Sequence, residues 1–332
     1  MVGTQSGRDS TLDVLRSAAM LYIIAVWHVG DYAIGLPFKN SYTGFLKACF
    51  LGLFVFLSGM LLSRRYVIAS GSDARRFYLH RVARIYPMYV LTLFGFLAAG
   101  LVTGRQLLQG LAGLNVLMGT PTQTLWFVEM LCIFYALAPL FLLRYTARRA
   151  LVMGLALTLG LQLASCLTHG SVDVRLGQYV SIFAIAIIAG RASRIERVLI
   201  ATPTVMCSVM ALPALLWLGK HVASGVAVLV SQVAILAFVL PAFVTARWTS
   251  RWLSPAVPRN VAYASYAMYL LHRLTARWLL AICHPTSLWL LLLYLYGLWL
   301  PFTYVLARVF QRGYDLFCDV LLSRMPDLGE AH

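Results

Sequence analysis

Apolar segments long enough to cross a lipid bilayer recur along almost the whole chain. Residues 45–63 and 222–244, for example, each hold about twenty residues with at most one charge, the length that an α-helix needs to cross ~30 Å of hydrocarbon. Backbone polar groups find no water in hydrocarbon, so segments of this kind fold as helices. The sequence therefore predicts an all-α fold, a polytopic membrane helix bundle.

The composition agrees with this class. Of the 332 residues, 61% are hydrophobic and 11% are charged, whereas soluble domains average about 25% charged residues. We expect a single integral-membrane domain over residues 1–332. Its ten predicted spans are residues 14–34, 45–63, 82–102, 123–143, 150–168, 177–190, 198–217, 222–244, 260–282 and 287–309. Segment 103–122, rich in Gly, Thr, Pro and Asn, is expected to be re-entrant or interfacial.

The basic residues indicate an orientation. The formal net charge is +16, but the charges form short clusters between apolar runs, as the positive-inside rule describes. With ten spans and an inside N-terminus, twenty Lys and Arg residues fall in inside segments and five in outside segments. Both termini are then cytoplasmic. We expect membrane lipids rather than nucleic acid as partners of this charge.

Three titratable side chains from distant parts of the sequence are predicted at similar depth. His28 lies roughly 18 Å beyond Arg16 along its helix, Glu129 lies in the outer third of its span, and His272 is near the middle of its own. Buried ionisable groups often mark a functional cavity. The alternative is that each one only hydrogen-bonds a neighbouring helix.

Two further patterns surround this predicted cavity. Asp31 follows His28 by three positions, so it either orients the imidazole or faces water at the helix end. On the cytoplasmic side, segment 64–87 holds six arginines, and Arg81 and Arg84 share one helix face. An arginine pair binds phosphate oxygens well, although lipid headgroups also explain such a cluster.

No metal or nucleotide motif is present. The sequence has no Walker A, GxGxxG, HExxH or GxSxG pattern, and its six cysteines are scattered without metal-ligand spacing. We therefore expect no metal site.

Five segments, in order along the chain, resemble the acyltransferase-3 family of integral-membrane O-acyltransferases. They are LDVLRSAAMLYIIAVWH (12–28), LFVFLSGMLL (53–62), FYLHRVARIYPMY (77–89), LWFVEMLCIFYALAP (125–139) and SYAMYLLH (265–272). The resemblance implies a ten-span enzyme that moves an acyl group, by default acetyl, from cytoplasmic acyl-CoA to a hydroxyl of an extracytoplasmic glycan or lipid-linked sugar. It also implies the bacterial inner membrane as the location. No SGNH-type hydrolase domain is expected.

The resemblance assigns candidate roles by position. His28 is expected to be the general base, and the other expected catalytic residues are Glu129, Asp31 and Arg16. Acyl-CoA, a co-substrate rather than a tightly bound cofactor, is expected to contact Arg76, Arg81, Arg84 and Ser58. The acceptor is expected to contact Tyr266, Tyr269 and His272, although such tyrosines often serve helix contacts alone. The rival functions are a transporter or flippase for a lipid or lipid-linked sugar, and a non-catalytic scaffold.

The first helix departs from the family in one respect. The family usually places ten residues between the arginine and the histidine, whereas eleven separate Arg16 from His28. In an α-helix this extra residue rotates the two side chains about 120° apart instead of about 20°. Either the two residues are not direct partners, or a π-bulge absorbs the extra residue.

Overall fold

The computed structural model describes residues 9–33, 36–191, 202–221 and 224–323, and all regular structure within them is helical. The helices, including the π and 3-10 segments named η, are α1 (Ser10–Leu21), η1 (Tyr22–His28), η2 (Val29–Asp31), α2 (Ser41–Arg65), α3 (Gly71–Ala98), α4 (Gly104–Leu111), η3 (Asn115–Leu117), α5 (Trp126–Leu142), α6 (Ala147–Leu167), α7 (Val174–Arg191), α9 (Thr202–His221), α10 (Ser224–Thr249), α11 (Ala256–Ile282), α12 (Leu288–Tyr294), η4 (Leu295–Trp299) and α13 (Leu300–Ser323).

Six of the described helical segments are long and apolar enough to cross a membrane. They are Ser10–Asp31, Ser41–Arg65, Ala147–Leu167, Val174–Arg191, Val226–Thr249 and Leu288–Val320. The all-helical membrane fold is thus confirmed, while the count of ten spans and the orientation of the termini stay predictions. Residues 34, 198–201 and 222–223 of the predicted spans lie outside the described residues.

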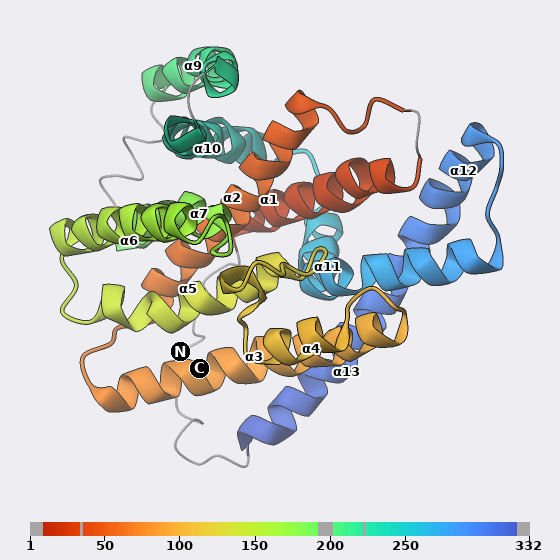
Figure 1. Cartoon of the computed structure of the whole chain (residues 1–332), viewed down its shortest axis with the longest axis horizontal. Helices are drawn as coiled ribbons and strands as arrows, with labels where there is room; N and C mark the ends of the chain where they lie inside the picture. Colours follow the sequence, from red (N-terminus) through yellow and green to blue (C-terminus); the bar gives the residue numbers. More distant parts are fainter. Residues whose placement is uncertain (1–8, 34–35, 192–201, 222–223, 324–332) are drawn as a thin grey trace, which may run out of the picture.

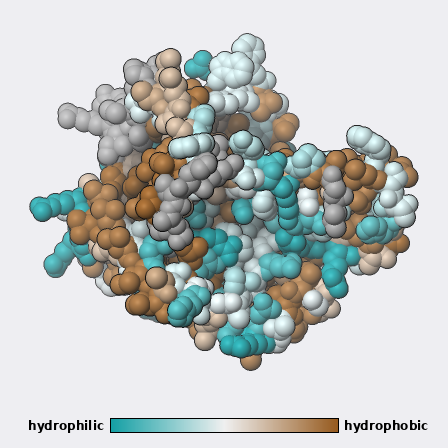
Figure 2. Space-filling view, turned by 45° about the horizontal axis from the view of Figure 1, so that its top comes forward, coloured by the Kyte–Doolittle hydropathy of each residue, from teal (hydrophilic) through white to brown (hydrophobic). Residues whose placement is uncertain are grey.

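The helices pack in a bundle whose centre is formed by α1, α2, α7 and α11 (Figure 1). α2 packs against α7, which also packs against α6, and α1 packs against α11, which also packs against α13. In Figure 1, α9 and α10 lie at the top of the bundle and α3 at the bottom. Figure 2 shows hydrophilic side chains across the middle of one face, with hydrophobic areas on either side.

The first span contains the π-helix that the sequence predicted as one of two alternatives. Residues Tyr22–His28 form η1, so the extra residue between Arg16 and His28 is absorbed before the histidine. The π-helix carbonyl of Ala25 accepts a hydrogen bond of 2.6 Å from the Tyr296 hydroxyl. Tyr296 lies in η4, a second π-helix. The two irregular segments therefore support each other.

The arginine segment lies on a helix that begins well before the predicted third span. Ser70 and Asp73 form a capping box at the N-terminus of α3, and hydrogen bonds from Ser70 and from backbone N–H groups lower the pKa of the exposed Asp73 carboxyl. Because this cap starts the helix at Gly71 rather than at residue 82, Arg76, Arg81 and Arg84 are all helical.

The segment between α3 and α5 folds back onto the bundle. Tyr86 and Tyr89 of α3 donate hydrogen bonds of 2.5 and 3.1 Å to the carbonyls of Leu111 and Gly110, at the C-terminal end of α4. These carbonyls would otherwise lack intrahelical partners. Protein groups thus satisfy the irregular backbone here, as a re-entrant or interfacial segment requires.

Candidate active site

The predicted His28 and Asp31 form a cluster with an arginine from another helix. His28, 7% exposed, ends η1, and its Nδ1 lies 2.8 Å from Asp31 Oδ2. Arg273 of α11 donates to the same Asp31 oxygen at 2.9 Å, and its terminal nitrogen lies 3.0 Å from His28 Nδ1. Lys39 also forms an ion pair with Asp31. One carboxylate therefore faces an imidazole and two cations.

The loop before α5 holds Arg273 from the other side. Thr124, whose φ is +65°, accepts a hydrogen bond at its hydroxyl from Arg273 Nε. Its carbonyl accepts one of 2.7 Å from the Tyr269 hydroxyl. Both donors come from α11. The strained backbone of Thr124 is thus tied to α11 twice, and it fixes where the guanidinium lies relative to His28.

Glu129 lies behind this loop and is only 1% exposed. Its Oε1 accepts hydrogen bonds from Tyr89 at 2.9 Å, Asn115 at 3.0 Å and Thr122 at 3.2 Å. Three donors on one oxygen join α3, η3 and the loop that carries Thr124. This arrangement suits a residue that positions the loop through Oε1, while the buried Oε2 has no hydrogen-bond partner among the described residues.

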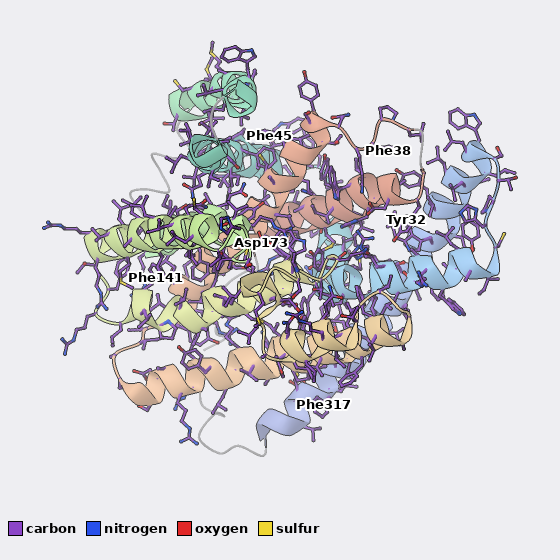
Figure 3. All side chains as sticks on the ribbon, in the orientation of Figure 1. Tyr32, Phe38, Phe45, Phe141, Asp173 and Phe317 are labelled. Atoms are coloured by element: carbon purple, nitrogen blue, oxygen red, sulfur yellow. The ribbon has the colours of Figure 1, made fainter. Side chains whose placement is uncertain are left out.

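His272 lies behind His28, and the two rings are in contact, tilted by 36° with centroids 4.7 Å apart. It is fully buried, its Nδ1 lies 2.8 Å from the carbonyl of Tyr269, and its own carbonyl accepts a hydrogen bond of 3.1 Å from Trp299 of η4. Tyr32 packs edge-on against the same tryptophan, between the end of the first span and α12–η4 (Figure 3). His272 therefore supports the ring of His28 from within the bundle.

A cavity of about 260 Å³ opens beside His28. Its lining residues are Ile23, Trp27, His28, Lys47, Leu51, Pro121, Thr122, Gln123, Thr124, Trp126, Arg175, Tyr269 and Arg273. A second, wider cavity of about 800 Å³ is lined by Asp31, Tyr32, Leu101, Gln123, Arg273, Arg277, Leu280 and Ala281. Arg273 and Gln123 line both cavities, so the cluster of His28, Asp31 and Arg273 lies between them.

The predicted coenzyme arginines gather at the opposite end of the bundle, which we call the arginine end. The charges of Arg65, Arg84, Arg81 and Arg76, together with the larger effect of burial, lower the pKa of His80 on α3. Arg76 and Arg84 are exposed. All four arginines thus act on one histidine and form a concentrated positive surface.

Arg81 is held differently from its neighbours. Its guanidinium carbon lies 5.2 Å from the ring centroid of Tyr135 and 5.3 Å from that of Tyr66, and Phe77 is 5.9 Å away. Its buried Nε has no hydrogen-bond partner among the described residues. Aromatic rings from α3, α5 and the α2–α3 loop therefore fix this cation and leave its hydrogen-bond donors available.

The packing of α3 against α11 relates the two ends. The Tyr266 hydroxyl donates a hydrogen bond of 2.8 Å to the carbonyl of Ile85, next to Arg84. Arg273 follows Tyr266 by seven residues on α11, a rise of about 10 Å. The arginine end and the His28 cluster are thus separated by a short stretch of the bundle.

Three other predicted site residues lie elsewhere. Tyr266 serves the contact with α3 just described, and it does not line the His28 cavity. Ser58 is half-buried in α2, beside the tight contact of Gly59 with α7. Arg16 lies about 18 Å before His28 at 1.5 Å per residue, which exceeds the reach of the two side chains. The π-helix brings Arg16 and His28 back toward the same face, at different depths.

Sequence comparison adds the remaining finding. The acyltransferase-3 family model, described as an acyltransferase domain, matches residues 9–309. The chain belongs to the acyltransferase-3 family. No curated protein and no solved structure matched the chain. Family membership identifies a membrane acyltransferase, and it favours this class over the transporter considered from the sequence.

Sequence reasoning missed several residues of this candidate site. The sequence assigned no role to Arg273, Lys47, Thr124 or Arg175. A signal existed for Arg273, because a cation within a span needs a counter-charge and Asp31 is an acidic residue at a span end. Thr124 carried no such signal, because its role depends on a backbone conformation.

Proposed function

We propose that the protein transfers an acyl group, by default acetyl, from cytoplasmic acyl-CoA to a hydroxyl of an extracytoplasmic glycan or lipid-linked sugar. The observation that carries the proposal is the His28–Asp31–Arg273 cluster beside a cavity. We place the protein in the bacterial inner membrane, where acyl-CoA and such acceptors are available on opposite sides.

His28 is the proposed general base. We assign the proton to Nδ1, which donates to Asp31 at the shorter distance of 2.8 Å; the Arg273 nitrogen 3.0 Å from Nδ1 then donates to the same carboxylate at 2.9 Å. This tautomer leaves the lone pair on Nε2. Asp31 then stabilises the imidazolium that forms when His28 takes a proton.

The reaction balances with the residues present. His28 Nε2 takes the proton of the acceptor hydroxyl as its oxygen attacks the thioester carbonyl. The C–O bond forms, the C–S bond breaks, and the leaving CoA sulfur takes the proton from His28. The negative charge that develops on the carbonyl oxygen lies in a cavity that Arg273 lines.

The coenzyme is proposed to bind from the arginine end. Its phosphates suit the positive surface of Arg76, Arg81 and Arg84, with Arg16 and Ser58 farther along the path. The pantetheine arm is comparable to four or five extended residues, roughly 15 Å. This length exceeds the rise of about 10 Å along α11 from Tyr266, which contacts α3 next to Arg84, to Arg273 of the His28 cluster. Tyr269, which lines the cavity, and His272, which supports His28, are proposed to serve the acceptor side.

The test is acyl transfer by the purified protein in detergent. Radiolabelled acetyl-CoA is supplied with a panel of soluble glycosides, and CoA thiol release and acceptor labelling are measured. We expect His28→Ala to lower the rate by about 10²–10⁴-fold, the usual contribution of a general base. His284→Ala is the matched control, because His284 is exposed and distant in sequence. Unchanged activity in His28→Ala would refute the assignment.

The arginine end is tested separately from the chemistry. Arg81→Ala should raise the KM for acetyl-CoA with a smaller effect on kcat, because it removes a contact to the bound coenzyme. Arg105→Ala, on the exposed face of α4, is the control for a lost positive charge. An equal effect of both variants would show that the arginine end does not bind the coenzyme.

A further inference from the structure

The cavity beside His28 is lined by an excess of positive charge. Three cations face it, Lys47 of α2, Arg175 of α7 and Arg273 of α11, and its lining contains no carboxylate. Cations enclosed among apolar helices are costly unless a negative group accompanies them. Which of the three already has a partner therefore decides what the cavity accepts.

Two of the three cations are compensated within the protein. Arg175 Nε lies 2.8 and 3.0 Å from the two carboxylate oxygens of Asp173, near the middle of the molecule (Figure 3). Arg273 is paired with Asp31 at 2.9 Å. Each guanidinium group is thus held by a carboxylate, and Asp31 is shared between Arg273 and Lys39.

Lys47 is the exception. No carboxylate lies within ion-pair distance of its Nζ in the part of the chain that the structure describes, and the Nζ lies over the ring of Trp27, 4.3 Å from the ring centroid. On the other side of the cavity, Trp126 holds Arg175 in the same way at 3.6 Å. A tryptophan face orients a cation but uses none of its hydrogen-bond donors. Lys47 therefore keeps donors and an uncompensated charge at the cavity.

We propose that the sugar acylated in this cavity carries an anionic substituent, a carboxylate or a phosphate, and that Lys47 binds it. This inference rests on the proposed function and names the class of its acceptor. A volume of about 260 Å³ accommodates roughly one sugar unit rather than an oligosaccharide. An anion at Lys47 and a hydroxyl at His28 then belong to the same or an adjacent sugar unit.

The first test compares acceptors. The purified full chain is assayed with acetyl-CoA and methyl glucuronide, methyl glucoside 6-phosphate or uncharged methyl glucoside. We expect the KM of one or both anionic acceptors to be about 10- to 100-fold below that of the uncharged one, the range for a hydrogen bond between charged partners. The two anionic compounds distinguish carboxylate from phosphate recognition.

The second test changes the cation. Lys47→Gln should raise the KM for the anionic acceptor by about the same factor and leave the KM for methyl glucoside unchanged, whereas Lys47→Arg should retain most of the preference. Arg105→Gln removes a positive charge elsewhere and should change neither value. Equal KM values for charged and uncharged acceptors in the wild type, or equal effects of Lys47→Gln on both, would overturn the inference.

Binding separates this inference from the proposed chemistry. The anionic glycosides are titrated without acetyl-CoA while the fluorescence of Trp27 is followed, with Trp27→Phe as the signal control. Binding that Lys47→Gln abolishes, without any acyl transfer, supports the anion site and contradicts the proposed enzyme reaction. Acyl transfer to uncharged glycosides, with no preference for anionic ones and no effect of Lys47→Gln, supports the enzyme reaction and overturns the anion site. The inference is also overturned if no anionic glycoside binds and none is acylated.

Discussion

Asp31→Asn tests the electrostatic core of the site. Asparagine keeps the shape of the side chain and one acceptor oxygen, but it removes the charge that faces His28 Nδ1 at 2.8 Å and Arg273 at 2.9 Å. The carboxylate is only partly exposed, at 19%. Its effect is therefore that of a partly screened ion pair.

The magnitude follows from the geometry. In the transition state His28 becomes an imidazolium, and the charge centres of the pair lie ~4 Å apart. At an effective dielectric constant of ~20, this attraction is about 4 kcal/mol. Its loss corresponds to a decrease in kcat of about a thousandfold. Because Asp31 acts through His28, the KM for acetyl-CoA should change little.

The assay is CoA release by purified variants of matched thermal stability. Asp315→Asn is the control, because Asp315 also accepts two hydrogen bonds, from Tyr263 at 2.6 Å and Gln311 at 2.9 Å, but lies on α13 away from His28. In a His28→Ala background, Asp31→Asn should cost almost nothing further. A kcat within about fivefold of wild type, or a full additional loss in the double variant, would refute the reasoning.

Three further outcomes are expected. Burial and the neighbouring arginines lower the pKa of His80, and the phosphates of bound CoA should raise it again, so that binding takes up a proton. CoA should therefore bind more tightly as the pH falls below ~6.5. In His80→Gln this increase of CoA affinity at low pH should be lost. Glu129→Ala leaves three donors unpaired, so we expect the free energy of unfolding to fall by about 1–3 kcal/mol for each donor, measured as a lower melting temperature. Glu129→Gln should keep most activity. Loss of activity in Glu129→Gln at unchanged melting temperature would instead make Glu129 catalytic. Gly59→Ala would place a Cβ 2.8 Å from the carbonyl oxygen of Phe183. We expect the free energy of unfolding, measured by thermal denaturation, to fall by about 1–3 kcal/mol. Gly160→Ala, whose Cβ meets nothing within 4 Å, should cause no such loss.

The fold class was predictable because it depends on local properties of the chain. Segment length and hydrophobicity decide that a membrane helix forms, whereas the exact ends depend on local features such as the capping box that starts α3 at Gly71. The π-helix before His28 was one of the two alternatives that the extra residue between Arg16 and His28 left open, and the structure contains it. His28 and Asp31 were found together because they lie one helical turn apart.

Only the tertiary structure decided which side chains meet across helices. No spacing in the sequence shows that Arg273 reaches Asp31, 242 positions away, or that Thr124 holds this arginine through a strained backbone. Nor does the sequence show that one oxygen of Glu129 accepts from three donors, or that Lys47 has no carboxylate within ion-pair distance among the described residues. Hydrophobicity fixes the helices, but the neighbours of each helix, and so the charges that compensate or fail to compensate one another, follow from packing alone.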